Sequence, residues 1–345
     1  MMTVIYGCIL AISWFGAHFI VSGSLTTGNL TSLFSYVMSV LMSLMMLSMV
    51  FVMITMSTAS AERICEVLNE KSSLSDPENP ITEVPDGSIV FDHVDFSYKK
   101  DSKEPVLKDV HLSIRSGETI GIIGGTGSAK SSLVSLISRL YDVTSGSVKV
   151  GGIDVRDYHM DSLRNQVAVV LQKNVLFSGT IIENLRWGDE HASDEVIKQA
   201  CIDACADDFI MSLPDGYETN LGQGGVNVSG GQKQRLCIAR ALLKKPKIII
   251  LDDSTSAVDT ATDAQIRETF RTKLKDTTTI IIAQRISSIE DADKIVVMDN
   301  GRINAVGTHS ELLENNEIYR EVYESQKKGA ESVSYTHLTL PTIRL

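Results

Sequence analysis

The first sixty residues contain no Asp, Glu, Lys or Arg, so every charged residue of the 345-residue chain lies after them. Helices inside a soluble protein normally keep charge on a solvated face. Residues 4–21 and 33–56 are mostly apolar, and about 20 helical residues cover the ~30 Å hydrocarbon core of a bilayer. We therefore predict two transmembrane helices within residues 1–58; a pair of core helices in a large soluble protein is the alternative.

The flanks of these runs indicate topology. Residues 22–31 are short, polar and contain glycine, as a reversal between two membrane helices would be, and the first charges are Glu62 and Arg63. A basic residue at the C-terminal end of the second apolar run favours placing that end in the cytoplasm. We expect a multi-pass protein of the cell membrane, in contact with the lipid bilayer, with its remainder in the cytoplasm. Residues 59–87 predict a helix and then a linker rich in proline and serine.

Charge and cysteine content exclude some classes of protein. The net charge of −11 argues against a nucleic-acid partner, because proteins that neutralise phosphates carry a basic face. The five cysteines form no C-x-x-C pair, which indicates reduced thiols rather than a disulfide framework.

A glycine-rich loop follows the third predicted strand of the charged region. Strands are predicted at 89–98, 106–114 and 118–123, and the last leads directly into Gly124-Gly125-Thr126-Gly127-Ser128-Ala129-Lys130-Ser131-Ser132. A strand, a glycine-rich turn and a helix opened by Lys-Ser form a cradle for phosphates. Lys130 would contact the β- and γ-phosphates, and the Ser131 hydroxyl would bind Mg²⁺. The strict pattern of such loops has glycine where this chain has Ala129. The methyl group of Ala129 destabilises the loop more if this residue has positive φ.

A second motif supplies carboxylates. Residues 246–253 form an apolar run that ends in Asp252 and Asp253, which is typical of a buried parallel strand. Ligands bind at the carboxyl edge of such sheets, so Asp252 is expected to reach the Mg²⁺ held by Ser131. Further strands are predicted at 277–282 and 294–298, with a hairpin turn at 299–301.

The segment Val228-Ser229-Gly230-Gly231-Gln232-Lys233-Gln234-Arg235 resembles the signature motif of ABC-transporter ATPases. The order of parts resembles the C-terminal portion of an exporter half-transporter. The resemblance implies an α/β P-loop nucleotide-binding domain over residues 88–326, with a RecA-like core, an antiparallel β subdomain and a helical signature subdomain, preceded by the two transmembrane helices.

The resemblance also assigns roles to residues, with ATP and Mg²⁺ as cofactors. Tyr98 matches the aromatic that stacks on adenine, and Gln172 the glutamine that touches Mg²⁺ and the attacking water. Ser229, Gly230, Gly231 and Gln232 match the segment that closes over an ATP held by the opposite subunit, and Asp259 matches the loop that crosses the dimer. Because each ATP site combines two subunits, a second half-transporter is implied as partner.

Two positions depart from the family pattern. Asp253 stands where the family has the glutamate that activates water, and its side chain is one methylene shorter; misplacement of about 1 Å can cost ~10²-fold. Gln284 replaces the switch histidine and cannot carry a proton, whereas acid–base assistance is worth ~10²–10⁴-fold. This pattern resembles the degenerate-site subunit of a heterodimeric exporter, whose own site hydrolyses ATP slowly.

Several alternatives stay open. An ordinary homodimer with variant residues, a purely regulatory nucleotide-binding subunit, and a soluble ABC ATPase all share these motifs; the uncharged sixty residues argue against the last. The transported substrate is not readable from the sequence. The family uses six membrane helices per half, so Met1 is expected to be an internal methionine or the start of a truncated frame. Residues 327–345 are expected to be a non-native or disordered tail.

Overall fold

The computed structural model describes residues 2–99, 102, 104–253 and 260–337. The chain divides into two compact units, Met1–Ser73 and Leu74–Leu345.

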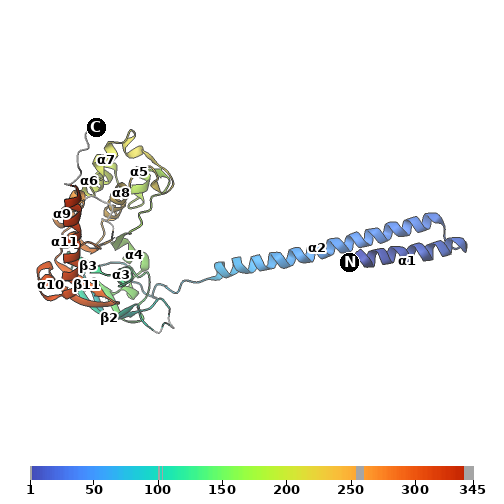
Figure 1. The fold of residues 1–345 in the computed structure, drawn as a ribbon, viewed down its shortest axis with the longest axis horizontal. Helices are drawn as coiled ribbons and strands as arrows, with labels where there is room; N and C mark the ends of the chain where they lie inside the picture. The colour runs from blue at the N-terminus through green and yellow to red at the C-terminus, as the bar shows by residue number, and fades with distance from the viewer. Residues whose placement is uncertain (1, 100–101, 103, 254–259, 338–345) are drawn as a thin grey trace. The chain divides into compact units, whose positions relative to one another are not determined.

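The first unit is a pair of helices, α1 (Met2–Val21) and α2 (Thr27–Asn69), which lie side by side (Figure 1). Thr26 caps α2 by accepting a hydrogen bond from Asn29 N, so the turn is shorter than the predicted 22–31. Gly16 brings the helices close, because a Cβ there would overlap the Leu30 side chain.

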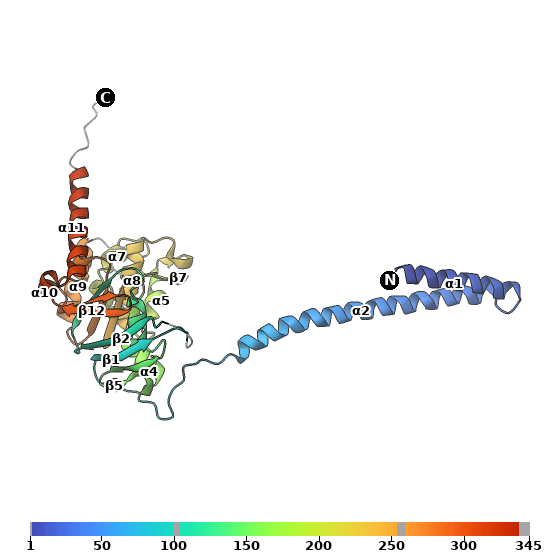
Figure 2. The ribbon, with the colours of Figure 1, turned by 60° about the horizontal axis from the view of Figure 1, so that its bottom comes forward.

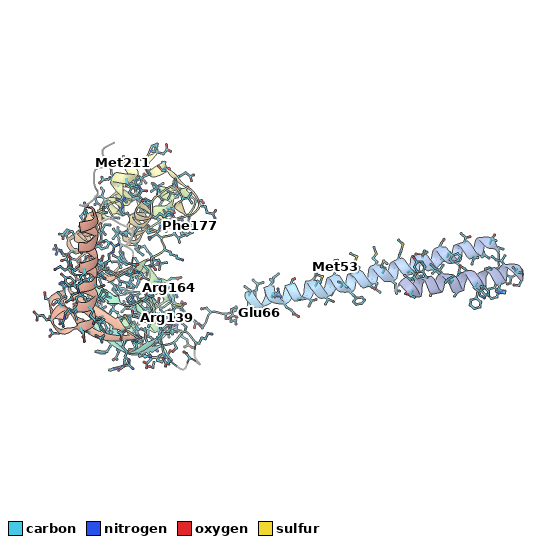
Figure 3. All side chains as sticks on the ribbon, viewed as in Figure 1. Met53, Glu66, Arg139, Arg164, Phe177 and Met211 are labelled. Atoms are coloured by element: carbon cyan, nitrogen blue, oxygen red, sulfur yellow. The ribbon has the colours of Figure 1, made fainter. Side chains whose placement is uncertain are left out.

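Length and composition distinguish these two helices. Among the described residues, α2 is the one helix long and apolar enough to cross a membrane, while the apolar stretch of α1, Ile5–Val21, is shorter. The α2 helix also includes the helix predicted after residue 59, since it continues without a break to Asn69. Its exposed apolar side chains, among them Met53, are drawn in Figure 3.

The second unit contains an antiparallel sheet of four strands, ordered β2-β1-β4-β5. Figure 2 labels β2, β1 and β5 of this sheet. Apolar residues of β1, such as Phe91, Val94 and Phe96, are buried in the core. The strands are β1 (Ile89–Phe96), β2 (Leu107–Ile114), β4 (Ser145–Val150) and β5 (Ile153–Asp154).

The central sheet has six strands in the order β12-β11-β3-β10-β9-β6, parallel except for β12. Successive residues of β9 alternate between two cores, Ile248 and Ile250 facing one and Ile249 and Leu251 the other, so both faces are covered. The strands are β3 (Thr119–Gly124), β6 (Val167–Val170), β9 (Ile248–Asp252), β10 (Thr278–Ile282), β11 (Lys294–Asp299) and β12 (Arg302–Gly307).

Helices cover the sheet and form a separate helical layer in which α8 packs on α5 and α6. The predicted α/β domain with an antiparallel β subdomain and a helical subdomain is thereby confirmed. Of the two predicted transmembrane helices, α2 alone among the described residues is long and apolar enough to cross a membrane. The α-helices of this unit are α3 (Lys130–Ile137), α4 (Met160–Gln166), α5 (Ile181–Arg186), α6 (Asp194–Asp203), α7 (Asp207–Met211), α8 (Gly230–Leu243), α9 (Thr260–Lys273), α10 (His309–Asn315) and α11 (Glu317–His337). A short ladder joins β7 (Gly179–Thr180) to β8 (Asn220–Leu221). The 3₁₀ turns are η1 (Val155–Asp157), η2 (Gly216–Glu218), η3 (Gln223–Gly225) and η4 (Ile286–Ser288).

Both predicted boundaries of this domain differ from the structure. The compact unit begins at Leu74 rather than near residue 88, because the predicted linker pairs with distant backbone: Ile81 N donates to Asp157 O at 2.9 Å, and the buried Arg139 (Figure 3) donates from Nη2 to Ser75 O at 3.1 Å. At the other end, α11 continues through the first part of the predicted tail to His337.

Candidate nucleotide-binding site

The glycine-rich loop connects β3 to α3, and lysine and serine open the helix as predicted. Gly127 has φ +82°, in the left-handed region that favours glycine. Ala129 has φ +71° and ψ 23°, in the left-handed region. An alanine in this conformation is strained by about 1–2 kcal/mol. The sequence predicts a larger cost of the Ala129 methyl group at positive φ, and positive φ is what the structure has.

Lys130 lies across the mouth of this loop. Its Nζ donates to Gly124 O at 2.7 Å, to Gly125 O at 2.9 Å and to Ser128 Oγ at 3.3 Å. Burial lowers the pKa of the ammonium, while the nearby carboxylates Asp252 and Asp253 oppose that shift. The first N–H groups of α3 have no intrahelical acceptor, and together with a lysine they form an anion-binding set. This donor set fits the phosphates of a nucleotide.

Ser131 and Asp252 come together across the sheet edge. Ser131 Oγ donates to Asp252 Oδ2 at 3.0 Å, and the two residues lie at the start of α3 and the end of β9. Hydroxyl and carboxylate oxygens are the ligands that Mg²⁺ prefers. The pair therefore fits the divalent cation that accompanies a nucleotide, with Gln172 as the third predicted ligand.

Asp253 is the meeting point of three loops. Its φ is +47°, and its N–H donates to Ile282 O at 2.9 Å. Its Oδ2 accepts from Gln172 Nε2 at 3.0 Å and from Gln284 Nε2 at 2.7 Å. Burial raises the pKa of this carboxyl, and the Asp252 carboxylate adds to the increase, while the Gln172 hydrogen bond opposes it. The three predicted catalytic residues thus form one hydrogen-bonded cluster.

Tyr98 lies beside the start of α3. Its hydroxyl is 2.8 Å from Ser132 Oγ, and its ring makes edge-on contacts with Phe96 and Tyr141 at centroid distances of 4.8 and 5.0 Å. The side chain is 54% exposed. An exposed aromatic face next to the phosphate loop is compatible with stacking on a base.

The Ser229 segment forms the start of α8. Ser229 is the N-cap, and a reciprocal capping box joins Ser229 N to Gln232 Oε1 at 2.8 Å and Gln232 N to Ser229 Oγ at 3.3 Å. Ser229 and Gly230 are exposed and Gly231 is half-buried. The described hydrogen bonds do not connect this segment to the Lys130 loop. Asp259, the predicted dimer-crossing residue, lies outside the described residues.

One contact at the site has no signal in the sequence. Gln326 of α11 donates from Nε2 to Gln284 O at 2.7 Å and accepts from Ile286 N at 2.9 Å. A lone glutamine on an amphipathic helix far along the chain matches no motif. Sequence reasoning missed it for that reason.

These features define a nucleotide-binding α/β domain of the phosphate-loop class, and comparison with known proteins gives the family. Residues 107–256 match the ABC transporter family. The chain is 44% identical over 310 residues to "Putative multidrug export ATP-binding/permease protein YgaD" of Bacillus subtilis, covering 90% of this chain and 53% of that protein. It is 42% identical over 327 residues to "Uncharacterized ABC transporter ATP-binding protein YfiB" of the same organism, covering 94% and 56%.

A solved structure agrees. The structure of a bacterial Atm1-family ABC exporter with ATP bound superposes with a TM-score of 0.75 at 33% identity, covering 94% of this chain and 58% of that one. The chain thus carries an ATP-binding domain of the ABC transporter type. It spans about half the length of the curated relatives it matches.

Proposed function

We propose that this chain is part of one subunit of an ABC exporter, held in the membrane by its apolar helices with the ATP-binding domain in the cytoplasm. Its own phosphate loop binds ATP but hydrolyses it slowly, and its Ser229 segment completes the site of a different, second subunit. The matching relatives that carry export in their names support the exporter assignment.

Nucleotide binding rests on an intact set of residues. Lys130 and the N–H groups at the start of α3 would bind the phosphates, and Tyr98 would contact the base. Ser131, Asp252 and Gln172 would hold Mg²⁺, which when bound neutralises charge on the phosphate oxygens.

Slow hydrolysis rests on one observation, the position of the Asp253 carboxylate between two side-chain amides. An amide donates hydrogen bonds but neither takes up nor passes on a proton. Both described partners of Oδ2 therefore hold the carboxylate in place without assisting proton transfer. Loss of acid–base assistance costs ~10²–10⁴-fold, and the short aspartate adds a positional loss of up to ~10²-fold.

The partner role rests on the Ser229 segment. Its capping box holds Ser229 and the following N–H groups at the N-terminus of a 14-residue helix, where N–H groups and the helix dipole attract anions. This end is exposed, so it is accessible to a phosphate held by another subunit.

An apolar groove next to Gln172 supports a protein contact close to the site. Leu171, Val175, Phe177 and Trp187 line it and are exposed; the rings of Phe177 and Trp187 are stacked with centroids 4.5 Å apart. An exposed apolar patch of this kind marks a protein contact. We assign it to a partner protein, so that movement at this patch reaches Asp253 through Gln172.

The decisive experiment compares ATP turnover by the purified protein with that of the double variant Asp253→Glu, Gln284→His. The double variant supplies a longer carboxylate and a proton-carrying side chain, and its turnover should rise by at least about 100-fold. Nucleotide affinity, measured with a fluorescent ATP analogue, should stay unchanged. Lys130→Ala in the same background is the control, and it should abolish binding and turnover.

The heterodimer part has its own test. Ser229→Arg places a bulky cation in the segment, so it should stop hydrolysis in the assembled complex while this chain still binds ATP. If the unaltered protein alone hydrolyses ATP as fast as the double variant, the slow-site proposal is wrong and a homodimer with variant residues is the better description.

A further inference from the structure

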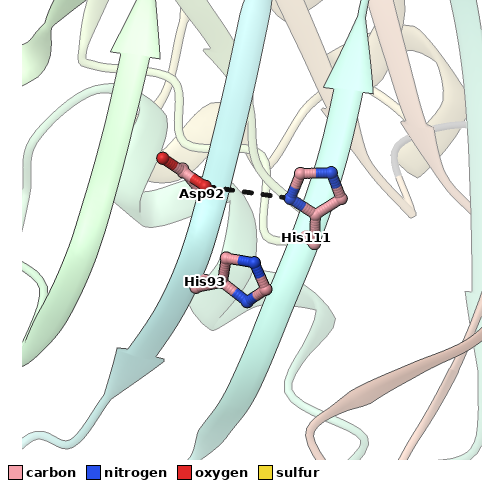
Figure 4. A group of neighbouring side chains, drawn as sticks. All are labelled: Asp92, His93 and His111. Atoms are coloured by element: carbon pink, nitrogen blue, oxygen red, sulfur yellow. Dashed lines mark ion pairs between the residues drawn. The ribbon is translucent and has the colours of Figure 1, made fainter.

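Three metal-ligating side chains meet on the antiparallel sheet, away from the nucleotide site. Asp92 and His93 belong to β1 and His111 to β2, and all three are exposed. Their ligating atoms all lie within 4.8 Å of one another. Figure 4 shows the three side chains turned toward a common point above the two strands.

A β-bulge produces this arrangement. Neighbouring residues of a regular strand point to opposite faces, so Asp92 and His93 would normally diverge. Here Phe91 pairs with Leu112 and Val94 with Val110, so Asp92 and His93 together oppose His111 alone. His93 has φ +46°, and the extra residue re-aims its side chain. Both side chains are therefore exposed, while Phe91 and Val94 remain buried.

A second bulge supplies a supporting carboxylate. Val94 pairs with Val110 and Phe96 with Leu107, so Lys108 and Asp109 together oppose one residue of β1. Asp109 has φ +50°, and its Oδ1 lies 2.6 Å from His93 Nδ1. Its backbone N–H is held by Asp95 Oδ1 at 2.8 Å. A carboxylate on one ring nitrogen is the usual support for a histidine that binds metal through the other.

We propose that Asp92, His93 and His111 bind a first-row divalent metal ion such as Zn²⁺. Asp109 occupies Nδ1 of His93, which leaves Nε2 as the ligand. His111 Nδ1 lies 4.0 Å from Asp92 Oδ1, and the two imidazole rings are 5.3 Å apart at their centroids. Two imidazoles and a carboxylate suit zinc-type ions rather than Mg²⁺ or Ca²⁺. The ligand atoms around a tetrahedral zinc ion lie about 3.4 Å apart, which is closer than the 4.0 Å between His111 Nδ1 and Asp92 Oδ1. Because the three side chains are exposed, they can move together by this amount.

The test is titration of the purified protein, free of any histidine tag and of nucleotide, with Zn²⁺ and with Co²⁺. Calorimetry should show one Zn²⁺ site per chain, and Co²⁺ should give the visible absorption of a low-symmetry site. His111→Ala should weaken binding by at least about 100-fold, and Asp109→Asn by about tenfold as a supporting residue. His191→Ala removes an exposed histidine outside the cluster and should have no effect.

Thermal unfolding provides a second measurement. An ion that binds the folded state alone stabilises it, so saturating Zn²⁺ should raise the Tm of the unaltered protein and of His191→Ala, but not of His93→Ala/His111→Ala. A 1 mM excess of Mg²⁺ should not compete. The proposal is overturned if His93→Ala/His111→Ala binds Zn²⁺ as tightly as the unaltered protein does. It is also overturned if Mg²⁺ displaces the bound Zn²⁺, or if the unaltered protein binds no Zn²⁺ at millimolar concentration.

Discussion

The contact between α11 and the segment after β10 predicts a role for Gln326 in positioning the site. The side-chain amide of Gln326 donates to the carbonyl oxygen of Gln284 and accepts from the N–H of the buried Ile286. The side chain of Gln284 in turn donates to Asp253. We expect Gln326→Ala to loosen residues 284–286 and, through them, the cluster around Asp253.

The magnitude follows from the two hydrogen bonds. Each contributes about 0.5–1.5 kcal/mol net, and Gln326 is half-buried, so their loss should cost about 1–2 kcal/mol in local opening. Since each 1.4 kcal/mol is tenfold in an equilibrium constant, amide exchange at Ile286 should accelerate by roughly five- to thirtyfold.

Hydrogen–deuterium exchange of the protein in detergent is the assay. Gln326→Glu keeps an acceptor for Ile286 N but removes the donor to Gln284 O, so its exchange should be intermediate. Gln199→Ala, which removes a surface contact with Asp203, is the control and should leave residues 284–286 unchanged. Unaltered protection at Ile286 in Gln326→Ala would refute the reasoning.

Three further predictions concern stability. Thr278 is fully buried, with Oγ1 donating to Gly87 O at 2.7 Å and accepting from Gly117 N at 3.0 Å; Thr278→Val should therefore cost about 2–4 kcal/mol in chemical unfolding, and a cost no larger than that of Thr279→Val would contradict this. Ala129→Gly relieves the positive φ and, after the entropy of glycine is subtracted, should stabilise by about 0.5–1 kcal/mol; a lower Tm would count against it. Burial raises the pKa of the Glu118 carboxyl, but the Lys294 ion pair at 2.6 Å and the Arg115 N–H lower it to a net value below 4.5. The stabilisation by the ionised Glu118 carboxylate is therefore present above pH 4.5 and is lost as the pH falls through the lowered pKa. The difference in Tm between the unaltered protein and Glu118→Gln should therefore vanish in acid. A difference in Tm that stays constant from pH 7 to pH 3 would refute this prediction.

Much of the ATP-binding domain was predictable because its signals are local. The loop that opens α3 and the apolar run that ends in Asp252 depend on neighbouring residues, and β3, β9 and β10 fall within a residue or two of their predicted bounds. Parallel strands that share one carboxyl edge then bring Ser131 and Asp252 together, as predicted.

Other features depend on contacts between segments far apart in the chain. The predicted linker is part of the domain because Ile81 pairs with backbone near Tyr158, which composition does not reveal. The clustering of Asp92, His93 and His111 depends on a two-against-one register between β1 and β2, and a strict alternation of residues would have separated the first two.

The sequence by itself determined the chemistry available to this chain: an uncharged stretch suited to a membrane, a loop for phosphates, and an aspartate and a glutamine at positions 253 and 284. Only the tertiary structure decided how these groups meet, with Asp253 held between Gln172 and Gln284, and Gln284 held in turn by Gln326. The physical reason is that residue type sets what a group can donate, accept or ionise, while the register of strands and the packing of helices set its neighbours.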